Sequence, residues 1–141
     1  MSRILVDNFQ EDHIQAAIEL WQSTPGVGLT PSDTIEHIKR FLKRNPTSNF
    51  IASKNGTLIG TVLCGHDGRR GYIHHLAVEK QHRQQGVAST LIDSALHALF
   101  LEDIHKCHSF AFRDNIVGNA FWGNSKWERR DDLAVYSFRL R

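Results

Sequence analysis

The segment Tyr72–Leu91, which reads YIHHLAVEKQHRQQGVASTL, has the residue types of a phosphate-binding turn. An apolar run leads into a short polar stretch, and Gly86 then begins a long stretch with helical apolar spacing. A helix N-terminus offers unpaired backbone N–H groups and a partial positive charge, and both favour a phosphate. Gly86 would let an anion approach the backbone, while Arg83 and His82 would add side-chain donors. The simpler alternative is a strand-to-helix connection that the glycine caps and that binds nothing.

The apolar run before this turn contains two adjacent histidines. Because side chains alternate along a strand, residues 72–78 should divide between two faces. We expect the even-numbered members on one face, namely Tyr72, His74, Leu76 and Val78. We expect the odd-numbered members on the other face, namely Ile73, His75 and Ala77. An imidazole titrates near neutral pH, so a histidine here could accept a proton, or it could be a hydrogen-bonded core residue.

A second informative segment begins at Arg113 and reads RDNIVGNAFW, with a further tryptophan downstream. Its distinctive members are one amide, one glycine and three aromatic residues, namely Asn115, Gly118, Phe121, Trp122 and Trp127. Taken alone, such a pattern indicates no more than a helix that packs aromatic side chains into a core.

Together the two segments resemble the signatures of the GNAT superfamily of N-acetyltransferases. Residues 83–88, RQQGVA, match the pattern R/Q-x-x-G-x-G/A, and Leu76-Ala77-Val78 matches the strand end before it. The resemblance implies a single domain over residues 1–141 of mixed α/β (α+β) class. Its twisted, mostly antiparallel mixed sheet would have six to seven strands with about four helices. The sheet would splay between the strand ending at Val78 and the strand starting near Cys107.

The resemblance also implies acetyl-CoA as cosubstrate, bound in that splay. No metal is expected, because no cluster of His, Cys and Asp residues has the spacing of metal ligands. The pantetheine arm would pair with the backbone of Leu76, Ala77 and Val78 as an added strand. The pyrophosphate would lie beside Arg83 and on the backbone amides of the turn, namely Gln84, Gln85, Gly86, Val87, Ala88 and Ser89. Asn115 would face the pantetheine arm, and Trp122 would pack against the cosubstrate.

For catalysis, the resemblance points to His74 as the base, through a water molecule, with Tyr72 orienting that water or the amine. The backbone N–H of Leu76 would stabilise the oxyanion, and His75 would be structural. One departure is Trp122, where many members have a tyrosine that protonates the leaving thiolate. Trp122 cannot take this role, because an indole N–H is not a useful acid. Another is Phe110, where protein N-terminal acetyltransferases often have a glutamate or histidine.

The acceptor is expected to meet the first helix pair and its loop, at Trp21, Val27 and Leu29. Acidic residues such as Asp33 could hold a cationic amine or be ordinary solvated charges. The leading hypothesis is acetyl transfer to a primary amine of a small molecule or peptide. The alternatives are a protein N-terminal or lysine acetyltransferase, and a CoA-binding sensor or subunit without turnover. A homodimer is a further expectation from the resemblance.

The elements that would position these residues follow from local patterns, and we expect strands at residues 3–8, 49–54, 57–65, 72–78, 107–112 and 133–140. The Asn55-Gly56 and Asp67-Gly68 pairs predict tight turns between three of them. Helices are expected at residues 11–22, 86–101 and 116–125. Another, with Ser32 or Asp33 as N-cap, should end before Pro46.

Composition is that of an ordinary globular protein, with 141 residues, 40% hydrophobic residues and a formal charge of +2. The near-balanced charge and the lack of a clustered basic stripe argue against nucleic acid as a partner. We expect no membrane partner and a cytoplasmic protein, since no apolar run approaches bilayer length. The two cysteines, Cys64 and Cys107, lack the paired spacing of a zinc site and are expected to be reduced core thiols.

Overall fold

The computed structural model describes residues 3–141 and divides the chain into two compact units, which meet between Phe110 and Ala111. The single domain expected over residues 1–141 stays a prediction. Within the described part of the chain, no helix is both long and apolar enough to cross a bilayer.

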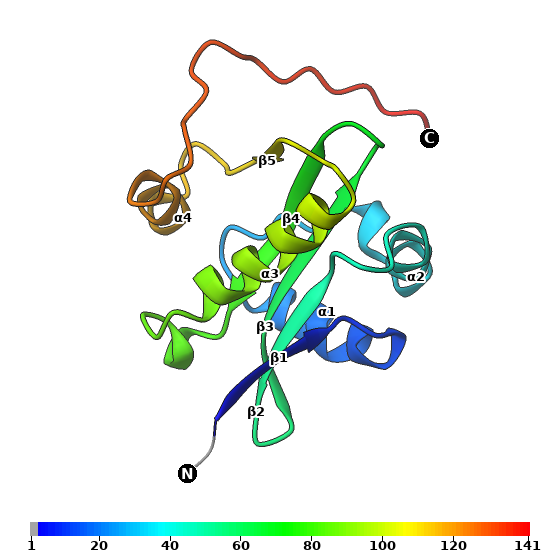
Figure 1. Cartoon of the computed structure of the whole chain (residues 1–141), viewed down its shortest axis with the longest axis vertical. Helices are drawn as coiled ribbons and strands as arrows, with labels where there is room; N and C mark the ends of the chain where they lie inside the picture. Colours follow the sequence, from blue (N-terminus) through cyan, green and yellow to red (C-terminus); the bar gives the residue numbers. More distant parts are fainter. Residues whose placement is uncertain (1–2) are drawn as a thin grey trace. The chain divides into compact units, whose positions relative to one another are not determined.

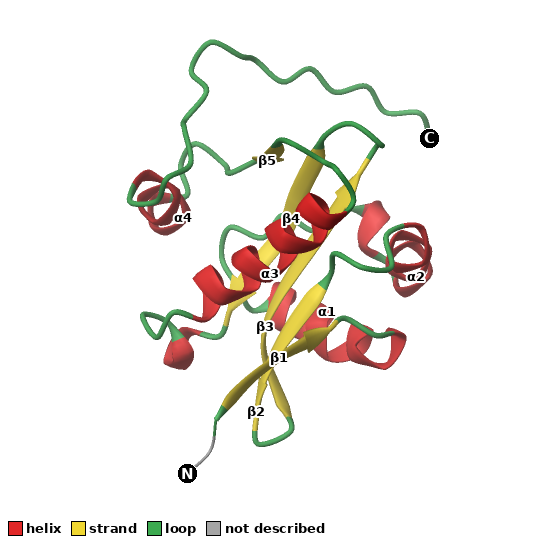
Figure 2. Ribbon diagram, in the orientation of Figure 1, coloured by secondary structure: helices red, strands yellow, loops and turns green. Residues whose placement is uncertain are grey.

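The first unit is built on a mixed sheet (Figure 2). Its strands are β1 (Ile4–Asn8), β2 (Phe50–Lys54), β3 (Thr57–His66), β4 (Gly71–Val78) and β5 (Cys107–Ser109). They lie in the order β1-β2-β3-β4-β5, with antiparallel pairs throughout except for the parallel pair β4–β5. The helices are α1 (Ile14–Gln22), α2 (Ile35–Arg44) and α3 (Val87–Leu101), and α4 (Ile116–Gly123) belongs to the second unit. The mixed α/β class and the four helices are confirmed.

The expected count of six to seven strands is wrong, because residues 3–141 contain five. The apolar alternation over residues 133–140 predicts a strand, yet this segment forms no strand and leaves Val135 and Phe138 exposed. Alternating apolar residues are typical of a strand with one buried face. A strand forms, however, only where a neighbouring strand makes hydrogen bonds with its backbone N–H and C=O groups.

Helices cover both faces of the sheet (Figure 1). On one face, α1 and α2 bury Trp21 and Ile38 in a core that also includes Leu63 of β3. On the other face, α3 packs against β2, β3 and β4, with Val87 and Leu91 close to Gly60. Any Cβ at Gly60 would lie 3.2 Å from the Leu91 side chain, so the glycine allows the close approach of α3. The first unit is therefore a three-layer arrangement of helices, sheet and helix.

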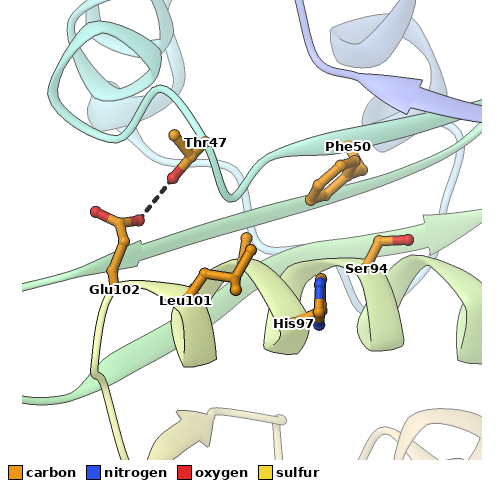
Figure 3. A pocket seen from close by; sticks show the side chains of 7 residues that line it. Thr47, Phe50, Ser94, His97, Leu101 and Glu102 are labelled. Carbon is orange, nitrogen blue, oxygen red and sulfur yellow. Dashed lines mark hydrogen bonds between the residues drawn. The ribbon is translucent and has the colours of Figure 1, made fainter.

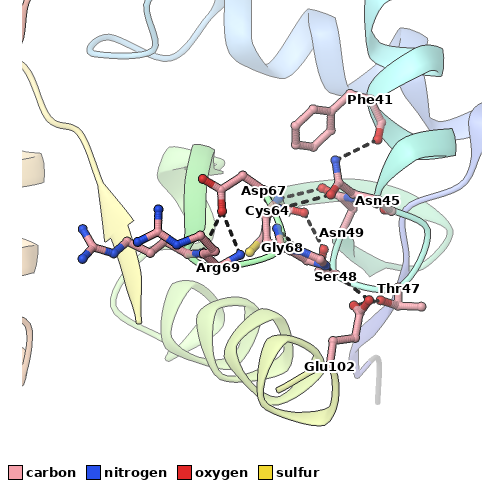
Figure 4. A network of polar contacts seen from close by, with 12 residues as sticks. Phe41, Asn45, Thr47, Ser48, Asn49, Cys64, Asp67, Gly68, Arg69 and Glu102 are labelled. Carbon is pink, nitrogen blue, oxygen red and sulfur yellow. Dashed lines mark hydrogen bonds and ion pairs between the residues drawn. The ribbon is translucent and has the colours of Figure 1, made fainter. Parts of the chain in front are cut away.

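Side chains replace a strand along the second half of β3 (Figure 4). The pairing of β2 with β3 ends at Phe50 and Val62. Beyond that point the N–H of Cys64 donates to Asn49 Oδ1 at 2.7 Å, and the Cys64 carbonyl accepts from the Ser48 hydroxyl. The amide of Asn45 extends the same pattern to the N–H of His66 at 3.2 Å. The loop before β2 thus satisfies backbone groups that would otherwise be buried without partners.

Replacing Asn49 with alanine should destabilise the protein by about 2 kcal/mol, because a buried N–H of β3 loses its acceptor. The matched control is Thr47→Ala, which removes a hydrogen bond between exposed groups and should cost about 0.5 kcal/mol or less. Urea unfolding midpoints at unchanged slope would measure both. Equal losses for the two variants would contradict the role assigned to Asn49.

Candidate active site

A bulge interrupts β4 in the middle of the predicted site. Leu63 of β3 lies opposite His74, whereas Thr61 lies opposite Ala77, so three steps along β4 match two along β3. The extra residue is accommodated near His75, which has a left-handed φ of +47°. A left-handed φ is uncommon for a residue with a side chain, and bulges of this kind re-aim side chains next to functional sites.

The bulge makes the predicted division of faces wrong beyond His74. Tyr72 and His74 do share a face, opposite Gly65 and Leu63 of β3. Ala77 lies on that face too, because it belongs to the same core as Leu63. The even-odd alternation assigned Ala77 to the opposite face, and it assigned Val78 to the face of His74. Val78 instead pairs with Gly60, on the side covered by α3.

A buried chain of hydrogen bonds holds the bulge in place. The Trp21 indole N–H donates to Thr61 Oγ1 at 2.8 Å, and the Thr61 hydroxyl donates to the His75 carbonyl at 2.9 Å. Trp21 is 1% exposed and Thr61 is 0% exposed, so the bond between them is buried, while the bond to the half-buried His75 is partly shielded. Trp21 was expected to contact the acceptor, but it is buried here, and we assign it to positioning β4 instead.

His75 lies on the same side as Trp21, not on the opposite face of the strand as the alternation predicted. Its ring centroid is 4.7 Å from that of Trp21, and its Nε2 is 2.6 Å from Asp33 Oδ1. Asp33 was one of two expected N-caps of α2, but Thr34 is the cap, since its Oγ1 accepts the N–H of His37. Asp33 belongs to the preceding turn, where its carboxylate is available to fix the His75 ring.

His74 is the titratable side chain beside the bulge that faces solvent. Its ring lies between Phe41 of α2, with centroids 6.2 Å apart, and Tyr72, with centroids 6.5 Å apart. The surrounding protein shields the ring in part and lowers the pKa of His74 below its ordinary value of 6.5, and a charge on His75 lowers the pKa further. His74 is therefore mainly neutral at pH 7 and can accept a proton.

The sheet opens directly after Ile73. The pairing of β4 with β5 runs from Gly71 and Cys107 to Ile73 and Ser109. Beyond Ile73, no strand within residues 3–141 pairs with this edge of β4, so Leu76, Ala77 and Val78 present backbone groups there. An open edge of this kind accepts an extended ligand as an added strand.

The predicted phosphate-binding turn follows at the end of this edge. Gly86 has a left-handed φ of +81°, and a Cβ built on it would meet no atom within 4 Å. The first helical backbone bond joins the N–H of Thr90 to the Gly86 carbonyl, so the amides of Val87, Ala88 and Ser89 precede the ladder of α3. The exposed members of the turn are Gln84, Gln85, Gly86 and Ser89. The Arg83 Nε–H donates to the Val78 carbonyl at 3.0 Å, which ties the turn to β4.

The remaining predicted residues lie elsewhere in the chain. Val27 is half-buried against the core, and Leu29 is 40% exposed in the loop between α1 and α2. In the second unit, the Asn115 side chain caps α4 by accepting the N–H of Gly118 at 3.0 Å. The Trp122 ring lies 4.6 Å from that of Trp127, centroid to centroid. The contacts predicted between these second-unit residues and the cosubstrate stay predictions.

A hollow between the start of β2 and α3 is not part of this site (Figure 3). None of the predicted residues lines it. Its lining includes Phe50, His97 and Leu101, and Thr47 and Glu102, which also line it, are joined by a hydrogen bond. Within residues 3–141, no group of three His, Cys, Asp or Glu side chains is arranged to hold a metal ion.

Comparison with known proteins links this geometry to one family. The model of the acetyltransferase (GNAT) family matches residues 14–123. An acetyltransferase of Pectobacterium atrosepticum is 32% identical over 128 residues, which cover 90% of this chain and 89% of the relative. One from Photorhabdus laumondii is 33% identical over 137 residues, which cover 94% of this chain and 92% of the relative. The aminoglycoside N-acetyltransferase AAC(6')-Iy, solved with a CoA bisubstrate analogue, has the same fold at a TM-score of 0.78 and 18% identity, covering 97% of this chain and 99% of that one.

Replacing Thr61 with valine should destabilise the protein by about 1–3 kcal/mol, because it leaves the Trp21 N–H buried without an acceptor and removes the donor to the half-buried His75 carbonyl. Valine keeps the shape of threonine, so the loss would come from the hydroxyl group. Thr57→Val, at the exposed start of β3, is the matched control and should be nearly neutral. Thermal unfolding of both variants would measure the difference, and similar melting temperatures for the two would refute the role of Thr61.

Proposed function

The chain belongs to the acetyltransferase (GNAT) family, and we propose that it transfers an acetyl group from acetyl-CoA to a primary amine of a small molecule. The observation that carries this proposal is the open edge of β4, which runs from the exposed His74 to Val78 and is followed by the turn at Gly86. A base, an unpaired strand edge and an anion-binding turn then lie along one line of the backbone.

The described residues fit the cosubstrate in three respects. The backbone of Leu76, Ala77 and Val78 would pair with the amide-containing pantetheine arm. The amides that precede the α3 ladder would hold the pyrophosphate, in the open space above Gly86. Arg83, tied to the Val78 carbonyl, would place positive charge beside it. Acetyl-CoA, when bound, would supply the acetyl thioester, and Asn115 and Trp122 are proposed to contact it from the second unit.

The chemistry proposed for this chain is base-assisted direct attack. An alkylamine is mostly protonated at pH 7, so neutral His74 would accept one proton from it, through a water molecule that Tyr72 orients. The freed nitrogen would form the C–N bond while the C–S bond breaks, and the Leu76 N–H would stabilise the transient oxyanion. The second proton that leaves the nitrogen would go to the thiolate through water, since Trp122 has no acidic group.

A peptide or protein amine is the alternative acceptor, and a CoA-binding subunit without turnover is the alternative role. Phe110 stands on β5's continuation beside Tyr72 and supplies no group that could accept a proton. His74, which is neutral at pH 7, can serve as the base for a small amine, so no proton acceptor from the β5 segment is needed. Both features support the small-molecule reading.

Acetyl-CoA binding tests the cosubstrate site, and the sharpest variant is Gly86→Glu. The new carboxylate should repel the pyrophosphate and weaken binding at least about a hundredfold, well beyond one lost charge contact. Gly68→Glu is the matched control, because Gly68 also has a left-handed φ, of +91°, and open space around it, but lies in the turn before β4. Calorimetry should show wild-type affinity for this control. Absence of binding by folded wild-type protein would overturn the proposed function.

The pH dependence of turnover tests His74. Because its pKa is lowered, kcat/KM for the amine should rise with pH below 6.5 and stay level from there to about pH 8. In His74→Gln the amine must arrive already deprotonated, so the rate should fall about a hundredfold at pH 7 and keep rising through pH 8. His97→Gln, on the exposed face of α3, is the control and should keep the wild-type profile. A level profile retained in His74→Gln would assign the base elsewhere.

A further inference from the structure

Aromatic rings gather on the face of the sheet that carries His74. Tyr72 is at the centre of the group. Its ring lies 6.5 Å from His74 and 6.1 Å from Phe110, stacked in both cases, and 5.7 Å from His108, centroid to centroid. Phe41 of α2 meets the His74 ring edge-on at 6.2 Å. We call Phe41, Tyr72, His108 and Phe110 the aromatic wall.

The aromatic wall stands at the mouth of the sheet opening. The pairing of β4 with β5 ends at Ile73 and Ser109, and His74 and Phe110 are the next residues on the two chain segments. Phe110 is 61% exposed, and Tyr72 and His108 are half-buried. Large apolar rings on a surface are ordinary one at a time, but a contiguous group beside a proton acceptor marks a binding surface.

The carboxylate that acts on His74 already has a partner. Asp33 is the carboxylate whose charge raises the His74 pKa, and its Oδ1 is already 2.6 Å from His75 Nε2. An acceptor with several ammonium groups would need further carboxylates along this wall to offset its desolvation. Aromatic faces instead attract an aromatic body by stacking and a single ammonium by its charge.

We infer that the acceptor is a small primary amine that carries an aromatic ring. This inference rests on the proposed function and names its substrate class. The acceptor ring would stack on Tyr72 and Phe110, and the amine would reach His74.

The test compares four amines with the full-length protein and acetyl-CoA: 2-phenylethylamine, hexylamine, spermidine and an aminoglycoside. We expect the highest kcat/KM for 2-phenylethylamine. Phe110→Leu keeps an apolar side chain but removes a ring, so kcat/KM for 2-phenylethylamine should fall about fivefold while that for hexylamine changes less than about twofold. Phe100→Leu, at a ring that is 74% exposed on α3, is the matched control and should leave both values unchanged. Circular dichroism of each variant checks folding.

The outcomes separate this inference from the proposed function. If acetyl-CoA binds in the calorimeter but hexylamine, spermidine or the aminoglycoside is the better acceptor, the aromatic class is wrong and the acetyltransferase function stands. The same holds if Phe110→Leu lowers the rates with 2-phenylethylamine and hexylamine equally. If acetyl-CoA binds but none of the four amines is acetylated, the aromatic class is wrong. If acetyl-CoA does not bind, the proposed function fails first. Selective loss of 2-phenylethylamine turnover in Phe110→Leu supports the inference.

Discussion

The Thr61 hydroxyl is the contact on which the geometry of this site depends. It accepts a hydrogen bond from the buried Trp21 and donates one to the carbonyl of the half-buried His75. The bond to the His75 carbonyl stabilises the bulge, in which β4 has one residue more than the matching part of β3. The bulge therefore couples the packing of α1 to the direction of the site residues. Any other register of β3 and β4 would leave the buried Thr61 hydroxyl without its hydrogen-bond partner, so this one register is favoured.

The bulge and the short β5 together create the opening. Three residues of β5 pair with β4, and this pairing stops just before the bulge begins. The other edge of β4 stays bonded to β3, which the side chains of Ser48 and Asn49 also hold from the far side. The open edge is thus carried by a strand that cannot move easily, because helices pack on both faces of the sheet (Figure 1). Rigidity of this kind suits a site that must orient two reactants.

Sequence reasoning succeeded where structure is decided locally. The Asn55-Gly56 turn has left-handed φ angles at both residues. It failed at the bulge, because the bond from Trp21 to Thr61 spans 40 residues and has no local signal. The alternation rule then misplaced His75, Ala77 and Val78. The same rule proposed a strand over residues 133–140, where pairing depends on a partner and not on the pattern.

The two adjacent histidines show what the bulge achieves chemically. In a regular strand they would point to opposite faces, and each would meet a different environment. Here both lie on the α1 and α2 side, where Asp33 binds His75 and leaves His74 facing solvent. Any charge on His75 disfavours a second charge on His74, and partial shielding of the ring acts in the same direction. The backbone irregularity therefore gives one imidazole a carboxylate and leaves its neighbour neutral, as a base that works at pH 7 requires.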